Sequence, residues 1–124
     1  MTDRARILVV EDEERQRDTL VRHLTRDGFE VVDFGAAEPA IEELGKQSFD
    51  GLVTDLRLPG ADGIELVRRA RELDEELTAI VMTAYASVDT AVDALRAGAS
   101  DYVLKPLFFE ELSRKLRRGI EPSR

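Results

Sequence analysis

A doubly wound α/β fold, with helices on both faces of a five-stranded parallel sheet, is predicted by three features of this 124-residue sequence. Five short apolar runs alternate with segments of helical periodicity, at a spacing of roughly 25 residues. Three of the runs are almost continuously apolar, which is typical of strands buried on both faces. Glycine and proline fall mainly at the borders between segments. Alternation of this kind produces a parallel sheet between two layers of helices.

The strands are expected, in order, at 7–10, 29–34, 49–53, 77–82 and 102–104. Apolar residues at helical spacing predict helices that include 37–44, 66–73, 88–95 and 108–116. The first helix, ahead of the second strand, has the weakest pattern, with only Leu20, Val21 and Leu24 as apolar residues. Glycines that follow helical segments indicate left-handed caps at Gly28, Gly45 and Gly98.

Two packing expectations concern the last helices. Small residues in the fourth helix leave Val88, Val92 and Leu95 as its expected packing anchors, so we expect it to be loosely held. At the start of the fifth helix, Phe108 is expected in the core and Phe109 at the surface.

Composition limits the classes of function. Hydrophobic residues make up 43% of the chain and charged residues 35%, the mixture of a folded protein. The net charge of −8 argues against direct binding of nucleic acid. The chain has no cysteine, no apolar run of the roughly 20 residues that span a membrane, and no signal-peptide features at its start. We expect a cytoplasmic protein without membrane contact, with one domain at 3–120 and a linker or frayed end at 121–124.

Polar residues that could bind a ligand or take part in a reaction follow four of the five strands. Glu11 and Asp12 follow the first strand, Asp55 the third, Thr83 the fourth and Lys105 the fifth. Ligands of open parallel sheets bind outside the carboxyl ends of the strands, so these side chains are expected to converge. Taken singly, each has an ordinary explanation as a helix cap, a turn residue, a strand residue or a solvated charge. Their combination predicts a functional site.

The three carboxylates of this set need a cation or protonation. Two carboxylates about 4 Å apart repel by roughly 4 kcal/mol at an effective dielectric constant of about 20. Mg²⁺ suits an all-oxygen site that also receives a phosphate, whereas zinc lacks ligands, because the only histidine, His23, belongs to the first helix as a surface or packing residue. An aspartate can form an aspartyl phosphate, with a cation, a lysine and a hydroxyl stabilising the charge on the transferred group.

The chain resembles the CheY-like receiver domain of two-component response regulators over nearly its whole length. The resemblance rests on residues 9–13 (VVEDE), 55–63 (DLRLPGADG), 82–84 (MTA) and 97–106 (AGASDYVLKP), in that order. Residues 85–92 (YASVDTAV) look most like receivers of the NtrC type. The resemblance implies a flavodoxin-like sheet with strand order 2-1-3-4-5.

The resemblance also implies roles for the site residues. Asp55 is the expected phosphoacceptor for a sensor histidine kinase. Asp12, Asp55 and the backbone carbonyl of Arg57 are the expected Mg²⁺ ligands, with Glu11 acting through water. Lys105 is expected to pair with the phosphoryl group and to precede a cis bond to Pro106.

The expected switch follows from the same resemblance. Thr83 reorients to bond a phosphoryl oxygen, Tyr102 swings inward, and Ala84 leaves room for that movement. Arg57, two residues after the acceptor, and Tyr85, two residues after Thr83, are both bulky, which implies slow autodephosphorylation. Apart from its own phosphorylation and this slow loss of phosphate, the domain is not expected to be an enzyme. The sequence departs from the family pattern at Glu11, where an aspartate is common, and at Arg57.

Three other classes of protein fit the sequence less well. A haloacid-dehalogenase phosphatase needs an acid two positions after its nucleophile, where this chain has Arg57. A flavin or nucleotide carrier needs a phosphate-cradling loop after the first strand, where residues 11–14 are all acidic. A pseudo-receiver typically loses the equivalents of Asp55, Thr83 or Lys105, all of which are present.

The expected output is transcriptional, through an ATPase and DNA-binding module after the receiver. The alternative is a stand-alone or hybrid-kinase phosphorelay receiver. The face of the fourth helix, fifth strand and fifth helix is expected to change on phosphorylation and to form an isologous homodimer. Its expected surface charges are Asp89, Asp93, Arg96, Arg114 and Arg118.

Overall fold

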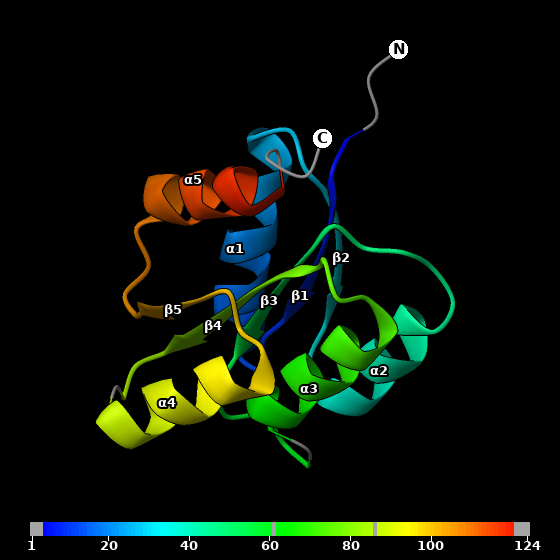
Figure 1. Ribbon diagram of the computed structural model, residues 1–124. Helices are drawn as coiled ribbons and strands as arrows, with labels where there is room; N and C mark the ends of the chain where they lie inside the picture. The colour runs from blue at the N-terminus through cyan, green and yellow to red at the C-terminus, as the bar shows by residue number, and fades with distance from the viewer. Residues whose placement is uncertain (1–3, 61, 86, 121–124) are drawn as a thin grey trace.

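Five strands alternate with five helices along the part of the chain that the computed structural model describes, residues 4–60, 62–85 and 87–120 (Figure 1). The strands are β1 (Arg6–Val10), β2 (Glu30–Phe34), β3 (Gly51–Asp55), β4 (Thr78–Thr83) and β5 (Asp101–Leu104). The helices are α1 (Glu14–Arg26), α2 (Ala37–Leu44), α3 (Gly63–Leu73), α4 (Val88–Ala97) and α5 (Phe109–Ile120). The expected linker at 121–124 and the first residue of the expected domain lie outside the described residues.

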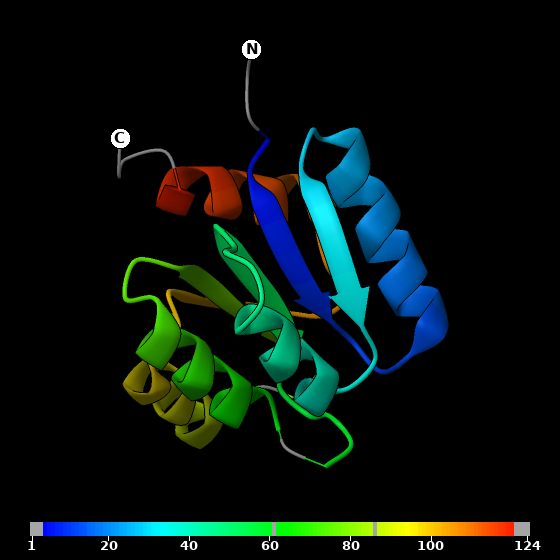
Figure 2. The ribbon, with the colours of Figure 1, turned by 90° about the vertical axis from the view of Figure 1, so that its right-hand side faces the viewer.

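All strand pairs are parallel, in the order β2-β1-β3-β4-β5. Helices α1 and α5 cover one face of the sheet, and α2, α3 and α4 cover the other (Figures 1 and 2). The predicted doubly wound five-stranded sheet is therefore confirmed, including its strand order. No helix within the described ranges has the length and apolar character needed to cross a membrane.

The central strands are apolar at consecutive positions because each face of the sheet has its own core. In β1, Ile7 and Val9 pack in the cluster that includes residues of α1 and α5, whereas Leu8 and Val10 pack in the cluster with α2, α3 and α4. Side chains alternate between the two faces of a strand, so a strand with helices on both sides needs apolar residues throughout.

Helix α1 forms despite its sparse apolar pattern. The Glu13 side chain caps it by accepting a hydrogen bond from Gln16 N at 2.9 Å. Leu20 and Leu24 are fully buried against the sheet. Burial of each contributes roughly 1.5–3 kcal/mol, so two leucines and a cap anchor an otherwise polar helix.

Strand β3 begins and ends two residues later than predicted. Phe49 is buried ahead of the strand, and Asp50 is bound to the start of β1, since its side chain accepts a hydrogen bond from Arg6 N and its N–H donates to Arg6 O, both at 2.8 Å. The apolar run thus starts ahead of the strand. As a result, Asp55 is the last residue of β3 and not a loop residue beyond it.

Three local predictions are wrong. Gly28 and Gly98 have left-handed backbones, with φ of 99° and 109°, but Gly45 is right-handed with φ of −80°.

The two phenylalanines at the start of α5 are exchanged relative to the prediction. Phe108 is 75% exposed, whereas Phe109 packs in the core and stacks on His23 with a ring distance of 4.0 Å. The reason is that α5 begins at Phe109, one residue later than the pattern suggested.

The expected packing of α4 is also wrong. Val88, Val92 and Leu95 are exposed, and Ala94 and Ala97 are the buried residues of the helix. Small side chains let a helix approach its neighbours closely, so the alanines form its packing surface and the larger residues face solvent.

Candidate functional site

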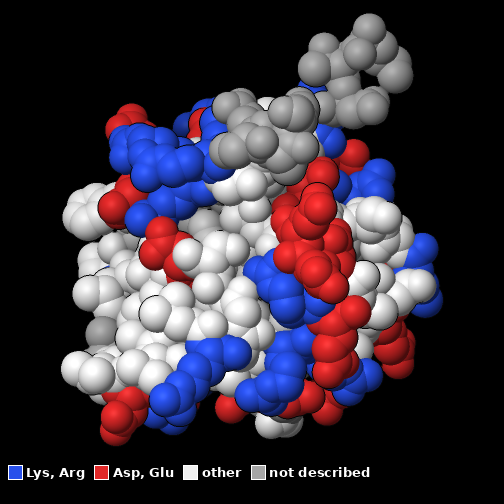
Figure 3. All heavy atoms as spheres, in the orientation of Figure 1, with Lys and Arg blue, Asp and Glu red and all other residues white. Residues whose placement is uncertain are grey.

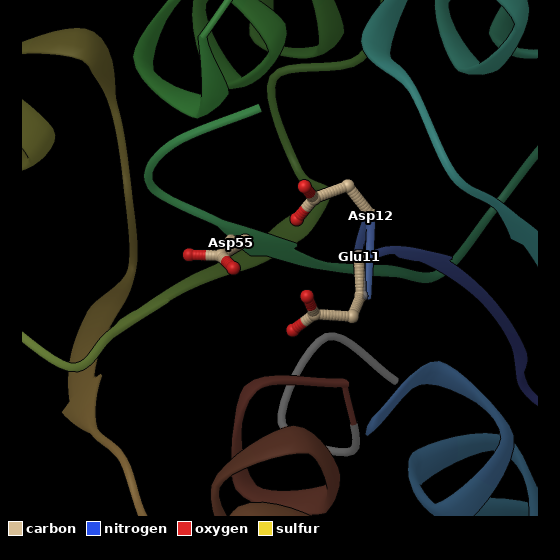
Figure 4. A group of neighbouring side chains, drawn as sticks. All are labelled: Glu11, Asp12 and Asp55. Atoms are coloured by element: carbon tan, nitrogen blue, oxygen red, sulfur yellow. The ribbon is translucent and has the colours of Figure 1, made fainter. Parts of the chain in front are cut away.

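The three predicted carboxylates meet at the carboxyl edge of the sheet (Figure 4). Glu11 and Asp12 directly follow β1, and Asp55 ends the neighbouring strand β3. One carboxylate oxygen from each lies within 4.8 Å of the others. Glu11 is 1% exposed, Asp55 is half-buried and Asp12 is exposed. Three oxygens at this spacing fit a hard divalent cation such as Mg²⁺, with Asp12 accessible from solvent.

Lys105, the first residue after β5, places its ammonium in this cluster. Its Nζ donates to Glu11 Oε1 at 2.6 Å, to Asp55 Oδ2 at 3.0 Å and to Gln16 Oε1 at 2.7 Å. The peptide bond between Lys105 and Pro106 is cis, as expected. The ammonium thus offsets part of the charge that the carboxylates bring together.

Burial and charge shift two pKa values in the site. Burial is the largest influence on Glu11 and raises its pKa, with a further increase from the charge of Asp55; hydrogen bonds from Lys105 and from Glu13 N oppose it. Burial by itself lowers the pKa of Lys105, but hydrogen bonds and charge from Glu11 and Asp55 outweigh it and raise the pKa. Lys105 is therefore held in its charged form.

Glu11 is fixed by its neighbours on both oxygens. Its Oε1 accepts from Lys105, and its Oε2 accepts from Glu13 N at 3.0 Å. The Glu11 backbone carbonyl accepts from Arg17 at 2.8 Å. Asp12 makes no such contact with the ammonium in the described structure, so the exposed Asp12 and the buried Glu11 are not equivalent acids.

The expected switch residues lie next to the site. Thr83 ends β4 and is buried, and its hydroxyl accepts a hydrogen bond from Tyr85 N at 3.1 Å. The Tyr102 hydroxyl is 2.7 Å from Thr90 Oγ1, in the first turn of α4. Thr83 is thus engaged with the loop after its own strand, and Tyr102 with α4.

Sequence reasoning missed two contributors to the site. Gly63 packs against the end of β3, where a Cβ would lie 2.1 Å from the Asp55 carbonyl oxygen. Gln16 supplies the third acceptor of Lys105. A glycine after a Pro-Gly loop and a glutamine in a polar helical turn carry no signal that separates them from ordinary surface residues.

A groove of about 530 Å³ opens beside the lysine. It lies between α1 and the segment joining β5 to α5, and Arg15, Thr19, Leu107 and Phe109 are among its lining residues. Its walls also include Glu11 and Lys105, so the groove gives access to the charged cluster from the α1 side.

The fold and site together define a class: an α/β domain with an acidic, lysine-paired site at the carboxyl edge of a five-stranded parallel sheet. A family model described as "Response regulator receiver domain" matches residues 7–117. The chain belongs to this family, the receiver domains of two-component response regulators.

Two curated relatives are response or transcriptional regulators. The response regulator protein FleR of Pseudomonas aeruginosa is 39% identical over 102 residues, covering 82% of this chain and 22% of FleR. The transcriptional regulatory protein ZraR of Escherichia coli K12 is 36% identical over 118 residues, covering 95% of this chain and 27% of ZraR. The chain thus spans about a quarter of the length of these relatives.

Solved structures show the same fold. A CheY-like receiver domain protein from Methanospirillum hungatei superposes with a TM-score of 0.92 at 29% identity, covering 97% of this chain and 96% of that one. The beryllofluoride-activated NtrC4 receiver domain dimer superposes with a TM-score of 0.88 at 28% identity, covering 96% of this chain and 98% of that one.

Proposed function

We propose that Asp55 accepts a phosphoryl group from the phosphohistidine of a sensor histidine kinase, in a reaction that requires Mg²⁺. The observation that carries this proposal is the contact of Lys105 Nζ with Asp55 Oδ2 at 3.0 Å, inside a cluster of three carboxylates. An acceptor carboxylate, a fixed cation and oxygen ligands for a metal are the parts that phosphoryl transfer needs.

The chemical step forms an O–P bond at Asp55 and breaks the P–N bond to the histidine, whose imidazole keeps the electron pair and takes a proton. Asp12, Asp55 and the Arg57 carbonyl are the proposed Mg²⁺ ligands, with Glu11 acting through water. Bound there, Mg²⁺ supplies positive charge against the phosphoryl oxygens. The Lys105 ammonium, which contacts Asp55 Oδ2, would pair with the same oxygens.

The proposed partner has a place to approach. The groove beside Lys105 is lined by residues of α1 and by Glu11 and Lys105, so the kinase domain that carries the phosphohistidine is proposed to dock against α1 next to the site. ZraR is a transcriptional regulatory protein, and most of its length lies outside the matched segment, which supports a transcriptional output. The domain is proposed to act in the cytoplasm ahead of an ATPase and DNA-binding module. A phosphorelay receiver without such a module is the alternative.

The proposed switch carries the signal from Asp55 to α4. Thr83 turns from Tyr85 N to a phosphoryl oxygen, and Tyr102 moves into the vacated space past Ala84. That movement breaks the contact of Tyr102 with Thr90. A two-state element biased by added charge responds in this way.

The proposed output face comprises α4, β5 and α5. Val88, Leu95, Leu104 and Phe108 are more than half exposed there. Over α4 and β5, the left part of Figure 3 is largely free of charged residues, with basic and acidic groups at its upper and lower borders. An apolar centre with a charged rim suits an isologous contact with a second copy, and a dimer is known for the NtrC4 receiver.

Phosphate labelling tests the proposal directly. Acetyl phosphate with Mg²⁺ is expected to add one phosphoryl group, measured by intact mass, and the label should decay slowly because Arg57 and Tyr85 are unsuited to activate water. Asp55→Asn should abolish the labelling, and EDTA should prevent it. Equal labelling of wild type and Asp55→Asn would show that another group is the acceptor.

A further inference from the structure

Gln16 is the one acceptor of the Lys105 ammonium to which the proposed function gives no role. Lys105 Nζ donates to Glu11, Asp55 and Gln16, at 2.6, 3.0 and 2.7 Å. An ammonium has three donors and no acceptor, so the amide must present its oxygen to it. The three N–H groups of Lys105 thus each have an acceptor, and Gln16 is the uncharged one of the three.

The start of α1 frees the Gln16 side chain for this contact. Gln16 is the third residue of the helix, a position from which glutamine often bonds back to the N–H of the capping residue. Here the N–H of Glu13 donates to Glu11 Oε2 instead, at 3.0 Å. The Glu13 side chain in turn accepts from Gln16 N at 2.9 Å. The cap thus fixes the Gln16 backbone and leaves its amide for Lys105.

The other two acceptors have a competing task. Glu11 and Asp55 belong to the cluster whose oxygens fit a divalent cation. A cation bound there repels the ammonium and draws on the same carboxylate charge. Gln16 is neutral and stands outside the cluster, so its bond to Lys105 does not compete with a metal.

We propose that Gln16 is a positioning residue, which keeps the Lys105 ammonium at the site when Mg²⁺ occupies the carboxylates. Lys105 is then in place to meet the phosphoryl group as it transfers to Asp55. The proposal rests on the proposed function, because it assumes that Asp55 is the acceptor.

The test uses two changes at one position and one matched control. Gln16→Met removes the acceptor at similar side-chain length, and Gln16→Glu keeps an oxygen there. Arg22→Met makes a comparable change at an exposed position of the same helix. Acetyl phosphate is the donor, because it has no protein surface that contacts α1. The labelling rate is measured across Mg²⁺ concentrations, Mg²⁺ affinity by calorimetry, and folding by thermal denaturation.

Gln16→Met is expected to lower the rate at saturating Mg²⁺ by roughly threefold to tenfold, the effect of losing one hydrogen bond to a charged group at a partly exposed site. Its Mg²⁺ affinity should stay close to that of wild type. Gln16→Glu should keep the wild-type rate and bind Mg²⁺ more tightly, because it adds negative charge. Arg22→Met should match wild type throughout.

Two results overturn the proposal: a wild-type saturating rate in Gln16→Met, or equal losses in Gln16→Met and Gln16→Glu, which would show a structural role. A wild-type protein that takes no label would instead overturn the proposed function, and this assignment with it.

Discussion

The Asp55 carbonyl leaves no room for a side chain at Gly63, where a Cβ would lie 2.1 Å from the oxygen. Gly63→Ala is expected to lower the free energy of unfolding by about 1–3 kcal/mol, because backbone must shift to relieve the overlap. Gly45→Ala is the matched control: the nearest atom is 3.4 Å from its Cβ position, and φ is −80°. It should be neutral or stabilise by about 0.4–1 kcal/mol. Urea denaturation measures both, and equal stability of the two variants contradicts the prediction.

The raised pKa of Lys105 predicts a stability difference that depends on pH. The folded state holds the proton more tightly than the unfolded chain, so the contribution is fully present below the ordinary pKa of 10.5 and is lost as pH rises through the folded value. In EDTA, the gap in unfolding free energy between wild type and Lys105→Met should therefore stay constant up to about pH 10.5 and shrink only above it. A gap that stays constant well above pH 10.5 would show that folding does not raise the pKa of Lys105.

At the scale of single residues, the sequence predicts those members of the site that stand at the ends of strands, such as Asp55 and Thr83, but not Gln16 in a helix. Glu11, Asp12, Asp55 and Lys105 could be found because a charge at a buried strand end needs a chemical reason. Gln16 could not be, since a polar residue in a helical turn is ordinary until the fold brings a lysine to it.

Among the secondary-structure elements, α4 is fastened differently at its two ends. At its C-terminal end, the Arg71 guanidinium donates to the Gly98 carbonyl at 2.6 and 3.2 Å and also to the carbonyls of Glu75 and Leu77. At its N-terminal end, Ser87 and Thr90 cap each other, and Thr90 also contacts Tyr102. Two hydrogen bonds from Arg71 tie the Gly98 end of α4 to α3, and the bonds to Glu75 and Leu77 hold the Arg71 side chain in place, so movement of α4 should begin at the Thr90 end.

Tyr102→Phe removes one hydroxyl and tests this asymmetry. Loss of the 2.7 Å contact with Thr90 should lower the local opening free energy of the first turn of α4 by about 0.5–1.5 kcal/mol. Amide hydrogen exchange in that turn should speed up, while the Arg71-bound end and α2 stay as in wild type. Thr90→Val combined with Tyr102→Phe should lose less than the sum of the two changes, because they share one bond. Uniform acceleration along α4 would contradict the asymmetry.

The elements themselves were predictable because a sheet covered on both faces requires continuous apolar strands, and their order along the chain follows. Which side of α4 is buried could not be predicted, since its alanines and its valines are both apolar. Only the space available between α3 and β5 selects the smaller residues for the buried side.

For the whole molecule, the apolar face on α4, β5 and α5 predicts self-association that depends on activation. Leu95 is 56% exposed in the last turn of α4. Beryllofluoride with Mg²⁺ should shift the sedimenting species from monomer toward dimer, and Leu95→Glu should prevent the shift by placing charge in the apolar centre.

Leu73→Glu is the control, because Leu73 is equally exposed, at 59%, but ends α3. It should dimerise like wild type. If both variants block association, the contact is not specific to the proposed face. If neither does, the dimer forms elsewhere.

The order of the strands has a consequence for the newly made chain. Translation releases the N-terminal part first, so β1 and β3, with all three carboxylates, leave the ribosome well before Lys105. Until β5 docks beside β4 at the edge of the sheet, the carboxylates lack the ammonium that pairs with them. We expect an incomplete chain to be unable to take phosphate from a kinase, so that signalling begins only with finished receivers.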